Sequence, residues 1–390
     1  MIAVGIPKEI KPGERRVSLT PEGVKKLTGH QTQVFVEKNA GVLSGFSDRE
    51  YEKAGAFLVE GKEKLWAKAV LIKKVKEPIS NEFKLFKPHH IIFTYLHLAS
   101  PSERPLIDRL IHSQATAIAY ETIEKNGETP LLKPMSEVAG VLAAYFAGIF
   151  KNHVQIKGTK ISGLDIAKSI MEKLASEYPK TPKSLPLGKV AVLGGGRVGK
   201  EAARMACAMG GEVFLSEISE EKRKELEKQF QSSGFKIDLI NPQDTENYEE
   251  VLTSSEIIIA AVHSAGKRAP IVIDPALLGK ISKHKKKIIL DIAIDQGGNV
   301  AESHPTDYEQ PLYLDSSKNL RFSVTNIPSL CGRGASLALE KVSLEYTIAL
   351  SRGLDEAIGC YPELRSGINV LRGIVTHPAI QEAHQLGQFS

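Results

Sequence analysis

The stretch Lys189-Val190-Ala191-Val192-Leu193 runs directly into Gly194-Gly195-Gly196-Arg197-Val198-Gly199. An apolar, β-branched run followed by the pattern G-x-G-x-x-G predicts a strand, a tight turn and a helix. Gly194 would permit the turn, Gly196 would let the backbone approach a pyrophosphate, and Gly199 would let the helix press against the strand. The N-terminus of that helix would add free N–H groups and the positive end of its dipole. The motif therefore predicts a dinucleotide site, with an ordinary glycine turn as the alternative.

The residues that follow favour the dinucleotide site. Residues 201–209 have the pattern of a helix, and residues 212–215 have the pattern of a second strand. Glu217 ends that strand at the spacing expected of an acid that binds ribose hydroxyls. A carboxylate there would repel a 2′-phosphate and favour NAD over NADP, although Lys222 nearby would weaken this preference. Together these features predict a Rossmann domain that binds NAD.

Length and composition are those of a globular protein with two domains. The 390 residues carry a formal net charge of only +5. The basic run at 283–287 is typical of a solvated helix end, so we expect no nucleic-acid partner. Three widely spaced cysteines, Cys207, Cys331 and Cys360, argue against a disulfide framework and against a metal cluster.

Targeting signals are not apparent in the sequence. No apolar run approaches the length that spans a membrane, and the early charges Lys8 and Glu9 interrupt any signal-peptide core. We therefore expect a cytoplasmic protein with no membrane partner.

Strand-like and helical stretches alternate on both sides of the glycine motif, which predicts parallel α/β sheets. The expected strands of the first domain are Ile2–Ile6, Val34–Val36, Ala56–Val59, Ala69–Lys73, Ile91–Tyr95 and Ala117–Ala119, with helices at 21–29, 47–54 and 101–113. The expected strands of the second domain continue at Phe235–Ile240, Ile257–Ala261 and Lys287–Ile294.

A helix from about Ser136, where Pro134–Glu137 resembles a cap, to Asn152 is expected to cross between the domains, and another is expected at 170–177. The tail, with a strand at 320–325 and a helix at 336–351, is expected to pack back on the first domain. The predicted fold is α/β, with two doubly wound parallel-sheet domains: residues 1–135 and 307–390 form a substrate domain, and a Rossmann domain, 136–306, is inserted into it.

Asp295 follows the last strand of the expected Rossmann sheet, just before Gly297-Gly298. In open α/β sheets, ligands bind beyond the carboxyl ends of the strands, so this side chain would lie near the reactive end of a bound cofactor. A loop or capping aspartate before a glycine turn is the alternative.

Several further motifs together resemble those of the alanine dehydrogenases, a family that includes the NAD-binding domain of proton-translocating transhydrogenases. The segments that carry the resemblance are Gly5–Glu9, Arg16-Val17, Gly45–Asp48, Lys74–Pro78, Phe93–Ala99, Ala119–Thr122, Pro134–Gly140 and Asp291–Gly298. The transhydrogenase domains are less similar, because they lack the Lys-Val-Lys-Glu-Pro and Tyr-Leu-His-Leu-Ala forms.

The resemblance implies roles for particular residues. Arg16 and Lys76 would hold the substrate carboxylate and carbonyl, and His97 and Asp295 would be the acid–base groups. The NAD site would be lined by Ser136, Gly194, Gly196, Gly199, Glu217, Lys222, Val262, Asp295, Val324, Asn326 and Ile327. These residue types suit the chemistry, since arginine offers a bidentate fork, lysine a point charge, and histidine a group that titrates near neutrality.

Without the resemblance, each of these residues also has an ordinary structural explanation. Arg16 beside Arg15 and Lys76 in a basic run are more simply solvated charges. His97 ends an apolar strand, so a place in a site is about as expected as a structural one, and Ser136 is also explained as a helix N-cap. Tyr95, Leu96 and Leu98 are expected in the core.

The resemblance implies NAD-dependent reversible oxidative deamination of L-alanine to pyruvate and ammonia, without a metal, in a homo-oligomer that is a hexamer in the family. Two alternatives remain: a dehydrogenase of a larger amino or opine-type substrate, and a transhydrogenase-like module without turnover. The sequence departs from the family at 151–186, at 329–336 near the expected substrate pocket, and at His263-Ser264 and His304 near the expected cofactor site.

Overall fold

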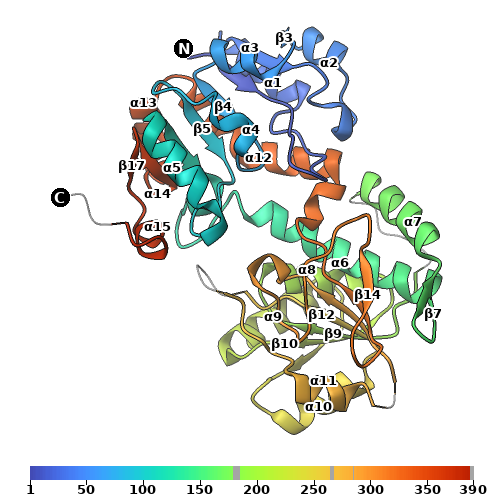
Figure 1. Cartoon of the computed structure of the whole chain (residues 1–390). Coiled ribbons are helices and arrows are strands. Elements are labelled where there is room, and N and C mark those ends of the chain that lie inside the picture. The colour runs from blue at the N-terminus through green and yellow to red at the C-terminus, as the bar shows by residue number, and fades with distance from the viewer. Residues whose placement is uncertain (179–184, 264–267, 284, 387–390) are drawn as a thin grey trace. The chain divides into compact units, whose positions relative to one another are not determined.

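The computed structural model describes residues 1–178, 185–263, 268–283 and 285–386. The chain divides into two compact units, Met1–Met135 with Ser329–Ser390, and Ser136–Pro328 (Figure 1). Each unit is built on its own mainly parallel sheet, which confirms the predicted α/β class. The second unit interrupts the first in sequence, as an inserted domain does.

The first unit contains an eight-stranded sheet in the order β17-β16-β6-β5-β4-β1-β2-β3. Its strands are β1 (Val4–Ile6), β2 (Val34–Glu37), β3 (Phe57–Val59), β4 (Leu71–Lys73), β5 (Ile91–Thr94), β6 (Thr116–Ala119), β16 (Ile368–Leu371) and β17 (Ile374–Val375). Its helices are α1 (Pro21–Gly29), α2 (Asp48–Lys53), α3 (Lys62–Lys68), α4 (Ser80–Phe83), α5 (Arg104–Ser113), α12 (Gly332–Leu350), α13 (Leu354–Cys360), α14 (Leu364–Gly367) and α15 (Pro378–Ala383).

The central strands β1, β4, β5 and β6 are parallel neighbours with mostly buried residues. Short apolar strands buried on both faces are typical of a parallel sheet covered by helices. Because the strands run in one direction, their carboxyl ends meet at one edge of the sheet. This edge carries the predicted substrate residues of the first unit.

The part of the tail from Ser329 onward packs back on the first unit, as expected, but the predicted strand at 320–325 belongs to the second unit, and the tail adds antiparallel strands that the sequence did not reveal. Strand β16 pairs antiparallel with β6, and β17 pairs antiparallel with β16. Arg372 and Gly373 between them both have positive φ, 48° and 82°. Two such residues form the tight hairpin turn that matches strand twist, so this edge of the predicted parallel sheet is mixed.

The second unit contains a seven-stranded sheet in the order β11-β10-β9-β12-β13-β15-β14. Its strands are β9 (Lys189–Leu193), β10 (Glu212–Ser216), β11 (Asp238–Ile240), β12 (Ile257–Ala260), β13 (Ile288–Asp291), β14 (Leu312–Leu314) and β15 (Leu320–Phe322). Its helices are α6 (Lys133–His153), which begins in the first unit, α7 (Leu164–Ser176), α8 (Arg197–Ala208), α9 (Glu220–Ser232), α10 (Thr245–Ser254) and α11 (Pro275–Ile281). The six parallel strands follow the order that defines a Rossmann fold, with β9 as the first.

The boundary of this unit lies later than predicted. Strand β15 pairs parallel with β13, with Leu320 opposite Ile288, and β14 pairs antiparallel with β15. Residues beyond 306 therefore complete the Rossmann sheet, and the unit extends to Pro328. The predicted strands at 287–294 and 320–325 are also too long, since they end at Asp291 and Phe322.

The segment at 151–186 folds into more structure than predicted. Strands β7 (Gln155–Lys157) and β8 (Lys160–Ser162) form a two-stranded hairpin of their own, and α7 begins before the predicted helix at 170–177. Residues 179–184 of this segment lie outside the described residues.

Candidate active site

Four neighbouring strands of the first sheet end at the same edge, and each is followed by a residue of the candidate site. Arg16 lies in the loop after β1, Lys76 after β4, His97 after β5 and Glu121 after β6. The structure therefore brings the three predicted residues of this unit to one edge, and it adds Glu121, which was not predicted.

Lys76 and His97 are in direct contact. The Lys76 Nζ lies 3.0 Å from the His97 Nε2. An ammonium group can only donate, so His97 accepts this hydrogen bond on Nε2 and the imidazole is neutral. Lys76 is buried with 8% of its surface exposed, whereas His97 is partly open to solvent.

The pKa of His97 differs from the expectation that it titrates near neutrality. Desolvation of the ring, followed by repulsion from Lys76, lowers the pKa of His97 to about 3, even though part of the residue is exposed. The neighbouring Glu77 raises the pKa of His97, but by less than desolvation and Lys76 lower it. At neutral pH the imidazole is therefore uncharged and cannot act as a cationic proton donor.

His97 lies in a turn just after β5 and has a left-handed backbone conformation. His97 has a backbone φ of 52°, and positive φ values are uncommon for residues other than glycine. The Glu121 carboxylate holds this turn, because its Oε1 accepts from the backbone N–H of His97 at 2.6 Å and of Leu96 at 3.1 Å. Tyr95, Leu96 and Leu98 around it are buried, as expected of core residues.

Arg16 is buried, and its guanidinium group forms a bidentate pair with the Glu14 carboxylate. The Arg16 Nε and Nη2 donate to the two Glu14 carboxylate oxygens at 2.7 and 2.5 Å. Its Nη1 lies 3.0 Å from the Met135 sulfur. The next residue, Val17, donates its backbone N–H to the Ser336 hydroxyl at 2.9 Å, so the unusual segment 329–336 packs directly beside Arg16.

Two further charges belong to this cluster and were missed in the sequence. Glu77 pairs with Lys76 at 3.3 Å and with Lys11. Burial alone would raise the pKa of Glu77, but the charges of Lys76 and Lys11 lower it to about 2. The adjacency of Glu77 to Lys76 in the sequence was a usable signal, whereas nothing local pointed to Lys11.

In the second unit, the glycines of the motif have the geometry that the motif requires. Gly194 has a φ of 97°, and a Cβ on Gly199 would collide with the Gly194 carbonyl oxygen. Gly196 is the N-cap of α8, and a Cβ there would meet no atom within 4 Å. Since the backbone beside Gly196 is open, the turn has the shape that fits a pyrophosphate at a helix N-terminus.

Glu217 directly follows β10 and pairs with Lys222. The Lys222 Nζ lies 2.9 Å from Glu217 Oε2, and the Ser219 N–H donates to Oε1 at 3.1 Å. Burial alone would raise the pKa of Glu217, but the contacts with Ser219 and Lys222 lower it. The carboxylate is therefore ionised beside the glycine turn, and Lys222 is its partner.

Asp295 lies beyond the carboxyl end of β13, in a short 3₁₀ turn at Ile294–Gln296, and is exposed. Its Oδ2 accepts from the Asn326 N–H at 3.4 Å, which brings two of the predicted residues together. Val324 and Ile327 on either side of Asn326 are buried, and the Ile327 carbonyl accepts from the Tyr308 hydroxyl at 3.0 Å.

Val262 follows β12, and its backbone N–H donates to the Asn299 side chain at 2.8 Å. The next residue, His263, contacts Gln296 at 2.9 Å, whereas Ser264 lies outside the described residues. His304 stacks on Tyr313, with ring centroids 3.9 Å apart.

Ser136 is not the helix N-cap that the sequence suggested. Helix α6 already begins at Lys133, so Ser136 lies within it, half-buried. Proline is favoured in the first turn of a helix, so Pro134 belongs to α6 and the helix begins before Ser136.

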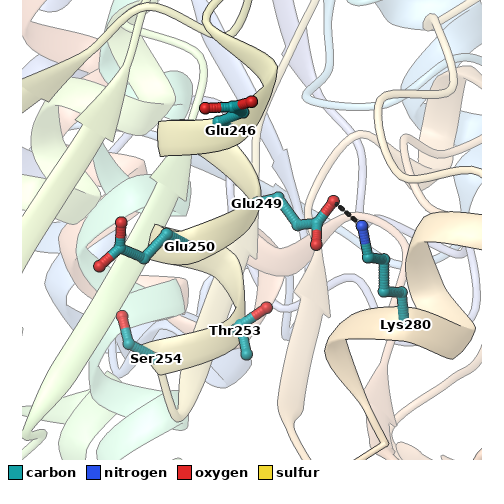
Figure 2. Close-up of a pocket in the computed structure, with 6 residues that line it drawn as sticks. All are labelled: Glu246, Glu249, Glu250, Thr253, Ser254 and Lys280. Atoms are coloured by element: carbon teal, nitrogen blue, oxygen red, sulfur yellow. Dashed lines mark hydrogen bonds and ion pairs between the residues drawn. The ribbon is translucent and has the colours of Figure 1, made fainter.

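A pocket elsewhere in the second unit contains none of the predicted residues. Figure 2 shows its lining from α10 and α11, where Lys280 pairs with Glu249 at 2.6 Å. Within the described ranges, no group of three or more His, Cys, Asp or Glu residues could hold a metal ion. No helix in these ranges is long and apolar enough to cross a membrane.

Comparison with known proteins places the chain among dehydrogenases. Residues 5–139 match the family model "Alanine dehydrogenase/PNT, N-terminal domain", and residues 180–378 match "Alanine dehydrogenase/PNT, C-terminal domain". Alanine dehydrogenase of Bacillus subtilis (strain 168) is 34% identical over 386 residues, covering 98% of this chain and 94% of that protein. Alanine dehydrogenase of Staphylococcus haemolyticus is 35% identical over 386 residues, covering 98% and 96%.

Solved structures agree with the sequence comparisons. An L-alanine dehydrogenase structure matches with a TM-score of 0.84 at 33% identity, covering 98% of this chain and 99% of the other. The transhydrogenase from Sinorhizobium meliloti shares the fold, with a TM-score of 0.73 at 21% identity, covering 97% and 99%. The resemblance seen in the sequence motifs is thus confirmed over the whole length, and the chain belongs to the alanine dehydrogenase/PNT family.

Proposed function

We propose that the protein catalyses the NAD-dependent, reversible oxidative deamination of L-alanine to pyruvate and ammonia. The observation that carries this proposal is the Lys76–His97 pair beside Arg16, in a chain whose full-length relatives are named alanine dehydrogenases. A free α-amino acid offers one carboxylate and one amine, and the site offers cations for the carboxylate and a neutral base for proton transfer.

The residues of the second unit fit NAD. The open backbone beside Gly196 and the N-terminus of α8 suit the pyrophosphate, and the ionised Glu217 suits ribose hydroxyls. Bound NAD would supply the acceptor for the hydride that leaves the substrate α-carbon. The remaining predicted lining residues, Ser136, Val262, Asp295 and Val324–Ile327, complete the proposed site.

The residues of the first unit would bind and orient the substrate. Lys76 would lie against the carbonyl oxygen of the 2-oxo acid, and Arg16 would hold the carboxylate. Glu14 fixes the plane of the Arg16 guanidinium, so little conformational freedom is lost on binding.

Proton transfer would fall to His97 and Asp295. Loss of hydride leaves an iminium, water adds to it, and the carbinolamine expels ammonia. His97 is neutral in the free enzyme; once Lys76 donates to the substrate oxygen instead of to Nε2, His97 would accept the proton of the added water and return it to the departing amine, while Asp295 would assist as the second acid–base group.

A small substrate fits this proposal, because the further charges of the cluster, Lys11 and Glu77, pair with each other and neither is assigned to a longer side chain. The segment 329–336 departs from the family sequence and contacts Val17, next to Arg16. A larger amino or opine-type substrate is therefore the alternative. We further propose a cytoplasmic homo-oligomer, a hexamer by analogy with the family.

The proposal is tested by following NADH formation with purified protein and a panel of alanine, serine, valine, glutamate and lysine. We expect alanine to have the highest kcat/KM, and pyruvate with ammonia to consume NADH in the reverse direction. A larger amino acid that exceeds alanine tenfold in kcat/KM would replace alanine as the substrate. No NADH formation with any amino acid would refute the enzymatic function.

A further inference from the structure

Asn299 is a buried polar residue at the carboxyl edge of the second sheet, with none of its surface exposed. Its Oδ1 accepts from the Val262 N–H at 2.8 Å, and its Nδ2 donates to the Val262 carbonyl at 3.0 Å and to the Pro270 carbonyl at 2.9 Å. One amide side chain thus satisfies both backbone groups of Val262, as a neighbouring strand would.

The backbone of Asn299 is anchored equally well. Its N–H donates to the Asp291 Oδ2 at 2.8 Å, and the same oxygen accepts from the Val300 N–H at 3.0 Å and the Ser303 hydroxyl at 2.6 Å. The Asn299 carbonyl accepts from the Val272 N–H at 2.7 Å. Asn299 therefore joins the end of β12 and the segment 270–272 to the loop that follows β13.

These contacts point toward the cofactor site rather than toward general stability alone. Val262 is one of the residues proposed to line NAD, and Asp295 lies in the same loop as Asn299. The Asn299 amide has a partner for its oxygen and for both of its N–H groups, and a fully satisfied buried polar side chain holds the segments it joins rigid. A rigid binding surface reduces the ordering that a ligand must impose when it binds.

We propose that Asn299 is a positioning residue for NAD, which holds the backbone of Val262 in the conformation that the cofactor contacts. This inference rests on the proposed function, since it assumes that NAD binds beside Val262. Removing the amide would leave two backbone groups of Val262 and one of Pro270 without their partner, and the segment would have to move to satisfy them.

The chain offers a matched control in Asn319. It is also fully buried, accepts from the Lys287 N–H at 2.9 Å, and donates to Ser282 and Asp315 at 2.8 and 3.0 Å. Lys287 and Asn319 directly precede β13 and β15, so Asn319 lies at the amino edge of the same sheet. Asn319→Ala should cost comparable stability while leaving the ligand edge unchanged.

The test compares the Kd for NADH, measured by fluorescence titration, in the wild type, Asn299→Ala and Asn319→Ala. We expect Asn299→Ala to raise this Kd at least about tenfold and Asn319→Ala to change it less than about twofold. Amide exchange at Val262 should accelerate only in Asn299→Ala, and the KM for alanine should change less than the KM for NAD. If an alanine variant does not fold, the isosteric pair Asn299→Asp and Asn319→Asp replaces it, because a carboxylate in place of the Asn299 amide keeps the acceptor but cannot donate to the two carbonyls.

Equal changes in Kd for the two positions, or a Kd within twofold of the wild type for Asn299 variants, would overturn the inference and leave the proposed function standing. A wild-type protein that binds no NADH would overturn the proposed function first and the inference with it.

Discussion

Replacing Lys76 with Met should raise the pKa of His97. The change removes the ammonium 3.0 Å from Nε2 and keeps a side chain of similar length. Coulomb's law gives about 1.4 kcal/mol for two unit charges at this distance even in a water-like dielectric, and more in a less polar one. Because about 1.4 kcal/mol corresponds to one pKa unit, the pKa should rise from about 3 by at least about one unit.

Two other features of the site affect the pKa of His97 in this variant. Desolvation remains in the variant, so the pKa should stay below its ordinary value of 6.5. Glu77 loses its partner at 3.3 Å, and its carboxylate then favours the imidazolium more strongly, which acts in the same direction as the loss of Lys76.

The assay is an NMR titration of the imidazole Cε1–H, assigned by its absence in His97→Gln. Lys84→Met is the matched control, because this exposed lysine pairs with Glu63 at 3.6 Å and is not part of the cluster. Its titration curve should coincide with that of the wild type. An unchanged or lower His97 pKa in Lys76→Met would show that the two side chains are not neighbours in solution, and the reasoning that Lys76 lowers the pKa of His97 would fail.

Three other results are expected. The wild type should have a higher kcat/KM with NAD than with NADP, and Glu217→Gln should narrow the difference in steady-state assays; a wild-type preference for NADP would refute the proposed role of Glu217. Asp295→Asn should lower kcat at least about a hundredfold while the Kd for NADH changes little, so a near-normal kcat would exclude an acid–base role. Burial lowers the pKa of Lys73 to about 7 from 10.5, so the unfolded state binds more protons between these values and the unfolding free energy should increase as pH rises through this range. Chemical denaturation should show that Lys73→Met lacks this increase, and an unchanged pH dependence would mean that Lys73 is charged in the folded state.

The Rossmann unit was predictable because its sequence signals reflect local steric demands. Gly194 needs a positive φ and Gly199 has no room for a Cβ, so both positions require glycine whatever surrounds them. The apolar runs around them are long enough to identify the central strands. Strands β14 and β16 are only three and four residues long, and β16 pairs with β6, which is distant in sequence, so no local pattern revealed them.

The candidate site was predictable in several of its members but not in its electrostatics. Arg16, Lys76 and His97 were identified through the resemblance to family motifs, whereas Glu121, Glu77 and Lys11 were missed. The low pKa of His97 depends on desolvation of its ring and on the 3.0 Å approach of Lys76, and the bidentate pairing of Arg16 depends on where Glu14 points. Such distances are set by tertiary packing, which spacing in the sequence does not encode.

The central claim is that hydride passes from the α-carbon of L-alanine to NAD. The most direct measurement incubates the purified protein with L-alanine deuterated at the α-carbon and with NAD, followed by mass spectrometry of the reduced cofactor and of the 2-oxo acid. The account predicts one deuterium in the reduced cofactor, an equal amount of pyruvate, and a slower rate than with unlabelled alanine if hydride transfer limits turnover. Reduced cofactor without deuterium, or no reduced cofactor at all, would contradict it.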